Sequence, residues 1–213
     1  MEFVSLRSII YDILNIIRGA KVGDDEPISE RQVESWVHQY RALLLKRDLD
    51  KHKDPNPAYI QNINNINLVL DSDKNTYRTS IEIPKPVDLN YGSGITFIGD
   101  SYGNQIQLVP ESRAPWQKYK KFTMGDTLAY INNNYIYIYN AKALSTIYIR
   151  GVFEIPTKVI EANGNIPTYD YPYPIPITLL PDLKSLILKT ELGIEYTSMS
   201  DNVNDANNVQ RQE

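Results

Sequence analysis

The chain has 213 residues, of which 42% are hydrophobic and 23% charged, a balance typical of a globular protein. Its formal net charge of −4 argues against a dedicated nucleic-acid-binding protein, and the absence of cysteine excludes disulfides and thiolate metal sites. No apolar run approaches the roughly 18 residues that span a bilayer, and the first residues lack a signal-peptide pattern, so we expect no membrane contact.

Two helices are predicted at the start of the chain. Residues 5–18 place leucine and isoleucine at helical spacing, and Gly19 follows as a C-terminal cap. Ser29 begins the second helix, with Gln32 completing a capping box. The apolar face of this helix consists of Val33, Trp36, Val37, Tyr40, Leu43 and Leu44.

The polar face of the second helix carries the charged side chains. It consists of Glu30, Arg31, Glu34, His38, Arg41 and Lys46. We therefore expect His38 to be a surface histidine. A short loop containing Gly23 predicts that the two helices form an antiparallel pair.

From about residue 60 to 155, apolar residues recur with the two-residue alternation of β-strands. Hairpins are predicted at 66–83 and 94–110, the second turning around residues 100–103. A third hairpin joins 128–131 to 135–139 through three asparagines, and a further strand spans 146–153. Prolines then favour an extended connector, and a last helix is expected at about 179–192.

Together these elements predict an α+β fold with an inserted, mostly antiparallel β domain. We expect a helical hairpin over 1–54 and the β domain over 55–156. The connector and C-terminal helix, 157–194, should pack on the helical part. The polar segment 195–213 has too few apolar residues to order by itself, which predicts an extended tail.

Two acidic clusters resemble metal sites only weakly. Asp71, Asp73, Asn75 and Glu82 occupy ligand positions of a calcium-binding EF-hand loop, but Thr76 stands where that loop needs glycine. A polar hairpin turn is favoured. In the stretch 48–54, interleaved lysines favour a solvated helix end, so we expect no metal.

Catalytic and cofactor-binding patterns are equally weak. The glycines of 92–97 precede no helix, which argues against a phosphate-binding loop, and neither histidine lies in a nucleophile motif. The stretch WQKYKKF, 116–122, mixes lysine with aromatics, which suits nucleic acid, although a lysine-protected strand edge is favoured. We expect no catalytic residue and no cofactor.

Tyrosine is the compositional anomaly, with 16 copies against 4 of phenylalanine. If the strands 135–139 and 146–153 are neighbours, isoleucines share one face and tyrosines the other. That second face carries Tyr135, Tyr137, Tyr139, Thr146, Tyr148 and Arg150. Helices of the same chain are one possible cover, but tyrosine with arginine favours a protein interface. A carbohydrate-binding platform is the alternative function.

Several long segments carry a resemblance to a known family. DEPISERQVESWVHQYRALLLKRD, RTSIEIPKPVDLN, AYINNNYIYIYN, IYIRGVFEIP and YPIPITLLPDLKSLILKTELGI resemble, in order, segments of a ring (head-to-tail connector) protein of crAss-like bacteriophages. The resemblance runs from about residue 5 into the tail. In layout alone the chain is also similar to the adaptor proteins of short-tailed phages.

This resemblance implies a structural role without catalysis. It implies a virion protein, made in the host cytoplasm, that forms a dodecameric ring beneath the portal and continues the DNA channel from capsid to tail. Its partners would be further copies of itself, the portal, neighbouring neck or tail rings, and genomic DNA that passes without specific binding. The candidate interface residues are the tyrosine face together with Glu195, Asp201 and Asn204, because we expect the tail to lie along a neighbouring protein.

Overall fold

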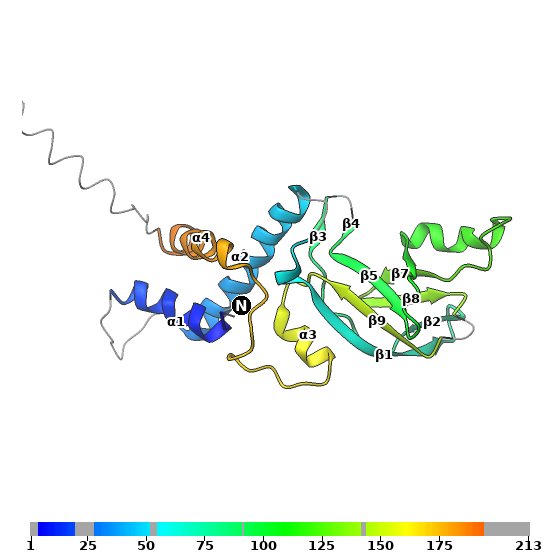
Figure 1. Cartoon of the computed structure of the whole chain (residues 1–213), viewed down its shortest axis with the longest axis horizontal. Helices are drawn as coiled ribbons and strands as arrows, with labels where there is room; N and C mark the ends of the chain where they lie inside the picture. The colour runs from blue at the N-terminus through cyan, green and yellow to red at the C-terminus, as the bar shows by residue number, and fades with distance from the viewer. Residues whose placement is uncertain (1–3, 20–27, 52–54, 91, 142–143, 194–213) are drawn as a thin grey trace, which may run out of the picture.

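The computed structural model describes residues 4–19, 28–51, 55–90, 92–141 and 144–193. It has an α+β fold in which helices from both ends of the chain lie beside a β domain inserted between them (Figure 1). The helices are α1 (Leu6–Ile17), α2 (Glu30–Lys51), α3 (Pro156–Ala162) and α4 (Leu180–Leu192), with 3₁₀ helices η1 (Pro57–Tyr59), η2 (Glu111–Tyr119) and η3 (Ile177–Leu179). The predicted fold class is thus confirmed.

Local sequence explains where the helices begin and end. The Ser5 side chain accepts a hydrogen bond from the Ser8 amide, and Ser29 does the same for Gln32. These caps satisfy amides that have no partner within a helix. Gly19 and Gly193 follow α1 and α4 at φ 55° and 65°, the left-handed conformation that glycine adopts without strain.

The helical core joins α1, α2 and α4. Its fully buried centre includes Ile9, Ile13, Val33 and Leu183, each of which contributes about 1.5–3 kcal/mol by leaving water. An extended strap over residues 163–176 closes this core along the start of α1. The Tyr173 amide donates to the Val4 carbonyl at 2.9 Å, and the Arg7 amide donates to the Tyr169 carbonyl at 3.0 Å.

The β domain is a strongly curled sheet of seven strands in the order β5-β9-β1-β2-β8-β7-β6, antiparallel except between β6 and β7. A short β3–β4 ribbon lies next to it. The strands are β1 (Gln61–Asp71), β2 (Thr76–Thr79), β3 (Asp88–Leu89), β4 (Gly92–Ser93), β5 (Ile95–Asp100), β6 (Gln107–Leu108), β7 (Leu128–Asn132), β8 (Tyr135–Tyr139) and β9 (Thr146–Gly151).

An irregularity in β1 lets one strand serve two partners. β1 pairs with β9 over its first half and with β2 over its second half. The register shifts between Ile63 and Ile66, where Asn65 has a positive φ of 53°. A bulge of this kind bends a strand, and here it keeps Ile63 and Ile66 both in the sheet core although they are three residues apart.

The curled sheet nearly closes on itself. The Ile106 amide donates to the Ile98 carbonyl of edge strand β5 at 2.8 Å, and the next residues, β6, pair with β7. One short segment therefore joins both ends of the strand order. The predicted hairpin over 94–110 is right in its turn and in the antiparallel pairing of Gln105 with Gly99, but beyond Ile106 the chain crosses to β7 instead of continuing beside β5.

Two further sequence predictions are wrong. Residues 116–119, expected at a strand edge, belong to η2, where Trp116 and Tyr119 are one three-residue turn of a 3₁₀ helix apart. The apolar face of α2 is displaced, since His38, Arg41 and Leu45 are buried whereas Leu43 is exposed. The helix lies between the helical core and the β domain, so two of its sides are covered (Figure 1).

Arg41 is the centre of the contact between these two parts. Its guanidinium is fully buried, and Nε and Nη1 each donate a 2.8 Å hydrogen bond, to the carbonyls of Pro174 in the strap and Phe153 beyond β9. The cation also lies 5.5 Å from the centre of the Tyr173 ring. Burial lowers the pKa of Arg41 to about 10, which leaves it charged at neutral pH. One side chain thus ties α2, the strap and the sheet together.

We predict that Arg41→Met lowers the free energy of unfolding by about 3 kcal/mol, because two buried carbonyls lose their donor. Arg47→Met, on an exposed position of the same helix, is the matched control and should change it by less than about 0.5 kcal/mol. Urea unfolding followed by circular dichroism measures both. Equal stabilities of the two variants would contradict the assigned role of Arg41.

Candidate functional site

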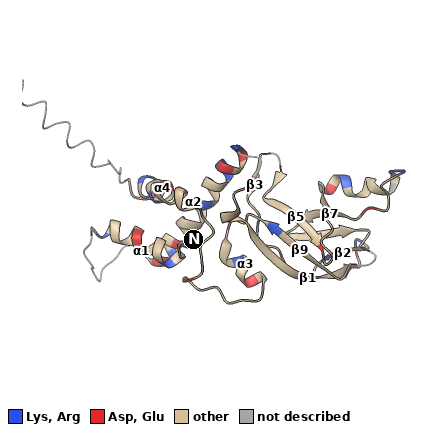
Figure 2. Cartoon of the chain, viewed as in Figure 1, with Lys and Arg blue, Asp and Glu red and all other residues tan. Residues whose placement is uncertain are grey.

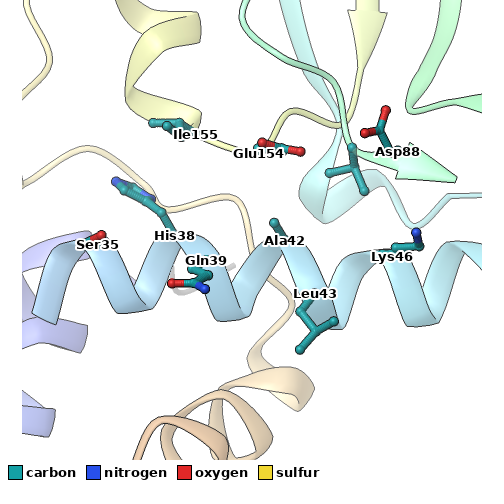
Figure 3. Close-up of a pocket in the computed structure, with 10 residues that line it drawn as sticks. Ser35, His38, Gln39, Ala42, Leu43, Lys46, Asp88, Glu154 and Ile155 are labelled. Atoms are coloured by element: carbon teal, nitrogen blue, oxygen red, sulfur yellow. The ribbon is translucent and has the colours of Figure 1, made fainter. Parts of the chain in front are cut away.

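A groove of about 510 Å³ separates α2 from the near end of the β domain (Figure 3). Its walls are Ser35, His38, Gln39, Ala42, Leu43 and Lys46 on α2, and Val87, Asp88, Glu154 and Ile155 opposite. Lys85 pairs with Glu154 at 2.8 Å and with Asp88 at 3.6 Å. The two carboxylates therefore serve an ion-pair network, and they do not form an acid–base pair.

His38 closes one end of the groove, and its predicted surface position is wrong. Only 9% of the residue is exposed, and Nδ1 lies 2.9 Å from the Tyr173 hydroxyl. Burial lowers the pKa of His38 to about 4, with a further contribution from the nearby Arg41 cation. Burial also raises the pKa of Tyr173, so its protonated hydroxyl can donate to the neutral imidazole. The pattern of charges along α2 gave no indication of this, because the strap that buries His38 comes from 135 residues away.

The favoured hairpin turn at 71–76 is confirmed. The Asp71 carboxylate accepts hydrogen bonds from the amides of Asp73 and Lys74, and Asn75 adopts φ 50°. These hydrogen bonds within the turn occupy the Asp71 carboxylate oxygen that would otherwise bind a calcium ion. Within the described part of the chain, no three histidine, aspartate or glutamate side chains gather as metal ligands.

The strands expected to form one tyrosine face are not neighbours. β8 pairs with β7 and β2, whereas β9 pairs with β1 and β5, so β1 and β2 separate them. Their isoleucines do share one core, because the sheet curls until Ile136, Ile138, Ile147 and Ile149 meet inside it. Strands adjacent in the chain were taken to be adjacent in the sheet, and the six-residue connection between them gave no indication that β1 and β2 lie between them.

Tyr137 lies beneath a helix of its own chain. Its ring stacks on Tyr130 at 5.2 Å, and both pack with Ala114 of η2 in a small aromatic cluster. The Lys74 ammonium lies 4.4 Å from the Tyr137 ring centre, and the Arg78 guanidinium lies 4.4 Å from that of Tyr135. The buried Tyr137 ring is not available as a stacking platform for a sugar.

The remaining candidate residues lie on different parts of the surface. Tyr139 is half-buried. Tyr148 stacks on Phe97 with 5.3 Å between the ring centres. The Tyr148 ring lies above Gly99, where any Cβ would collide with it. Arg150 is exposed and donates from Nε to Asn62 at 3.2 Å. Glu195, Asp201 and Asn204 lie outside the described residues.

Sequence reasoning missed an exposed aromatic surface on η2 and the turn after it. Trp116, Tyr119, Phe122 and Met124 are exposed by 66%, 70%, 90% and 59%. We call the segment 111–126 the projection. Figure 2 shows charged residues on it and on the helices, whereas most of the sheet ribbon is uncharged. A lysine-protected strand edge was expected here, and the density of aromatic residues in the stretch was the sequence feature that could have indicated an exposed aromatic surface.

Comparison with known families identifies the family of this chain. Residues 8–212 match the family model CrAss_Ring_2, described as phage tail ring protein 2. The chain belongs to this family. It is a structural ring component of the phage tail, and the family implies a non-enzymatic role and association with further copies of itself. The comparison with curated proteins gave no match. None of the helices in the described segments of this ring protein has the length and apolarity that crossing a membrane requires.

Acid should destabilise the ring protein through His38. Its pKa is about 4 in the folded state and about 6.5 when unfolded, so its contribution to stability is full above pH 6.5 and is lost as the pH falls to about 4. The loss amounts to about 3 kcal/mol. Urea unfolding of the wild type and of His38→Gln across this range should give a difference that shrinks at low pH. His52→Gln is the histidine control, and a difference independent of pH would refute the assignment.

Tyr137→Ser should lower the free energy of unfolding by about 3 kcal/mol, because it empties the space between Tyr130 and η2. Tyr139→Ser, from the same strand but half-buried, should cost about 1 kcal/mol. Thermal and urea unfolding of the two variants compare these positions directly. A larger loss for Tyr139 than for Tyr137 would show that the cluster does not stabilise the β domain.

Proposed function

We propose that the protein forms a dodecameric ring beneath the portal, in the neck between capsid and tail, and that this ring continues the DNA channel. The observation that carries the proposal is family membership over residues 8–212. The copy number and the position below the portal rest on the resemblance to the connector rings of crAss-like phages. The ring would join capsid to tail through contacts with the portal on one side and a further neck or tail ring on the other.

The charge of the chain suits a channel through which DNA passes. Each subunit carries a formal net charge of −4. A strongly basic lining would bind phosphates tightly, with an affinity that grows with every lysine or arginine that contacts the backbone. A ring of net negative subunits therefore allows the genome to move without specific binding.

The elongated arrangement of the subunit suits a closed ring. Ring closure uses heterologous contacts, in which two different surfaces of each subunit meet. The helical core and the far end of the β domain lie at opposite ends of the molecule (Figure 1). Tyr135, Tyr139, Tyr148 and Arg150 stay candidates for contacts with the portal or a neighbouring ring, whereas the buried Tyr137 would act by supporting the surface around it.

We predict that a particle reconstruction resolves twelve copies of this chain as one ring directly below the portal. Isolated subunits should stay monomeric in native mass spectrometry, since assembly would wait for the portal as a template. Mixing the subunit with purified portal should then give a complex with a portal-to-ring ratio of one to one. Density for the chain in a five-fold capsid position, or outside the neck, would contradict the proposal.

A further inference from the structure

The projection presents an apolar surface at the end of the β domain that lies farthest from α1 and α4, where it appears as the green helical segment in Figure 1. Four large side chains, from Trp116 to Met124, are each more than half exposed. Soluble proteins rarely expose such a patch unless it binds something. The packing of η2 on the sheet leaves these side chains outside.

The orientation of the projection is fixed by its packing. In a 3₁₀ helix, residues three apart lie above one another. Ala114 and Gln117 therefore form one buried row of η2, and Arg113, Trp116 and Tyr119 form an outer row, with the Trp116 and Tyr119 ring centres 5.9 Å apart.

The turn after η2 is held as well. The Asn140 side chain donates to the carbonyls of Met124 at 2.8 Å and Asp126 at 3.1 Å, and Gln117 donates to the Thr123 carbonyl. A surface held in this way loses little conformational entropy when it binds.

The projection is basic at its tip. The segment 111–126 contains four basic residues, Arg113, Lys118, Lys120 and Lys121, and two acidic residues, Glu111 and Asp126. Glu111 is engaged at the base, where it accepts a hydrogen bond from Asn132 and lies 3.9 Å from the Lys74 ammonium. A complementary partner would combine carboxylates with apolar side chains.

The C-terminal segment of the same chain has this composition. Residues 194–213 contain four acidic residues, Glu195, Asp201, Asp205 and Glu213, against the single basic Arg211. Ile194, Tyr196, Met199 and Val203 supply apolar side chains among them. The segment follows Gly193 at the end of α4, at the opposite end of the molecule from the projection (Figure 1).

We propose that the projection of one subunit binds the C-terminal segment of the neighbouring subunit, with the aromatic row contacting its apolar residues and the lysines contacting its carboxylates. The inference rests on the proposed ring, in which head-to-tail contacts bring opposite ends of successive copies together. Twenty extended residues span at most about 65–70 Å, which is long enough to cross a subunit boundary. Tethering in the ring then strengthens a contact that is weak between free molecules.

Fluorescence of Trp116 tests this contact directly. The chain has two tryptophans, and Trp36→Phe removes the partly buried one in the helical core. The full-length chain also carries three substitutions that weaken competition from its own tail, Glu195→Gln, Asp201→Asn and Asp205→Asn. This variant is titrated with a synthetic peptide of residues 194–213. We expect a saturable change in Trp116 emission that weakens as salt is added.

Charge reversal supplies the specific control. Lys120→Glu with Lys121→Glu should weaken peptide binding about tenfold, and a peptide whose acidic residues are replaced by lysine should restore it. Reversal of two exposed basic residues elsewhere, Arg47→Glu with Lys158→Glu, should leave binding unchanged. Phe122→Ser, at a position that is 90% exposed, should also weaken peptide binding, which tests the apolar part without a change of charge.

Three results would overturn the inference. The first is the absence of saturable binding at millimolar peptide. The second is equal peptide binding by the wild-type projection and the charge-reversed projection. The third is a Trp116 response to a DNA oligonucleotide but not to the peptide, which would make the projection a nucleic-acid-binding surface. A reconstruction that shows the ring with the C-terminal segment away from the projection would remove this contact and leave the ring standing, whereas absence of the ring would remove the proposed function.

Discussion

A single buried guanidinium determines how the two parts of this molecule are joined. Arg41 donates to one carbonyl in the strap and one beyond β9, so its position on α2 fixes both segments at once. Within the described residues Nη2 has no hydrogen-bond partner, so Nε and Nη1 make the two bonds that compensate for burial of the cation, and the planar guanidinium holds their two acceptors at a set angle. The junction is therefore geometrically specific in a way that the apolar cluster of Leu45, Tyr59, Val87 and Val152 beside it is not.

In the proposed ring this rigidity matters, because the two ends of each subunit contact different neighbours. If the helical core could turn relative to the β domain, the distance between the end of α4 and the projection would vary, and successive contacts around a ring would not close. Arg41 keeps that distance constant from inside through its bond to the Phe153 carbonyl, and the His38–Tyr173 pair holds the strap on α2. The ion pairs of Lys85 with Asp88 and Glu154 lie on the β-domain side of the groove, so they stiffen that wall alone, and only weakly because solvent screens them.

The β domain uses its tyrosines mainly as structure. Tyr130 and Tyr137 form the base on which η2 rests, and Tyr148 covers the glycine in β5. A sheet that nearly closes has few free edges and exposes little backbone to unwanted pairing. The exposed rings of Trp116, Tyr119 and Phe122 lie on the projection and not on the sheet face.

The sequence by itself determined the elements that depend on local chemistry. The cap at Ser29, the asparagine turn before β8 and the left-handed glycine at 19 gave helix ends and a hairpin correctly, because each acts within a few residues. The alternation of Ile136 and Ile138 likewise indicated a core-facing strand. Tertiary structure decided everything that depends on distant segments: that β1 and β2 lie between β8 and β9, that the strap buries His38 and Arg41, and that η2 covers Tyr137. Periodicity specifies which side of an element is apolar, but the segment that covers a polar or aromatic side is brought there by the packing of the whole chain.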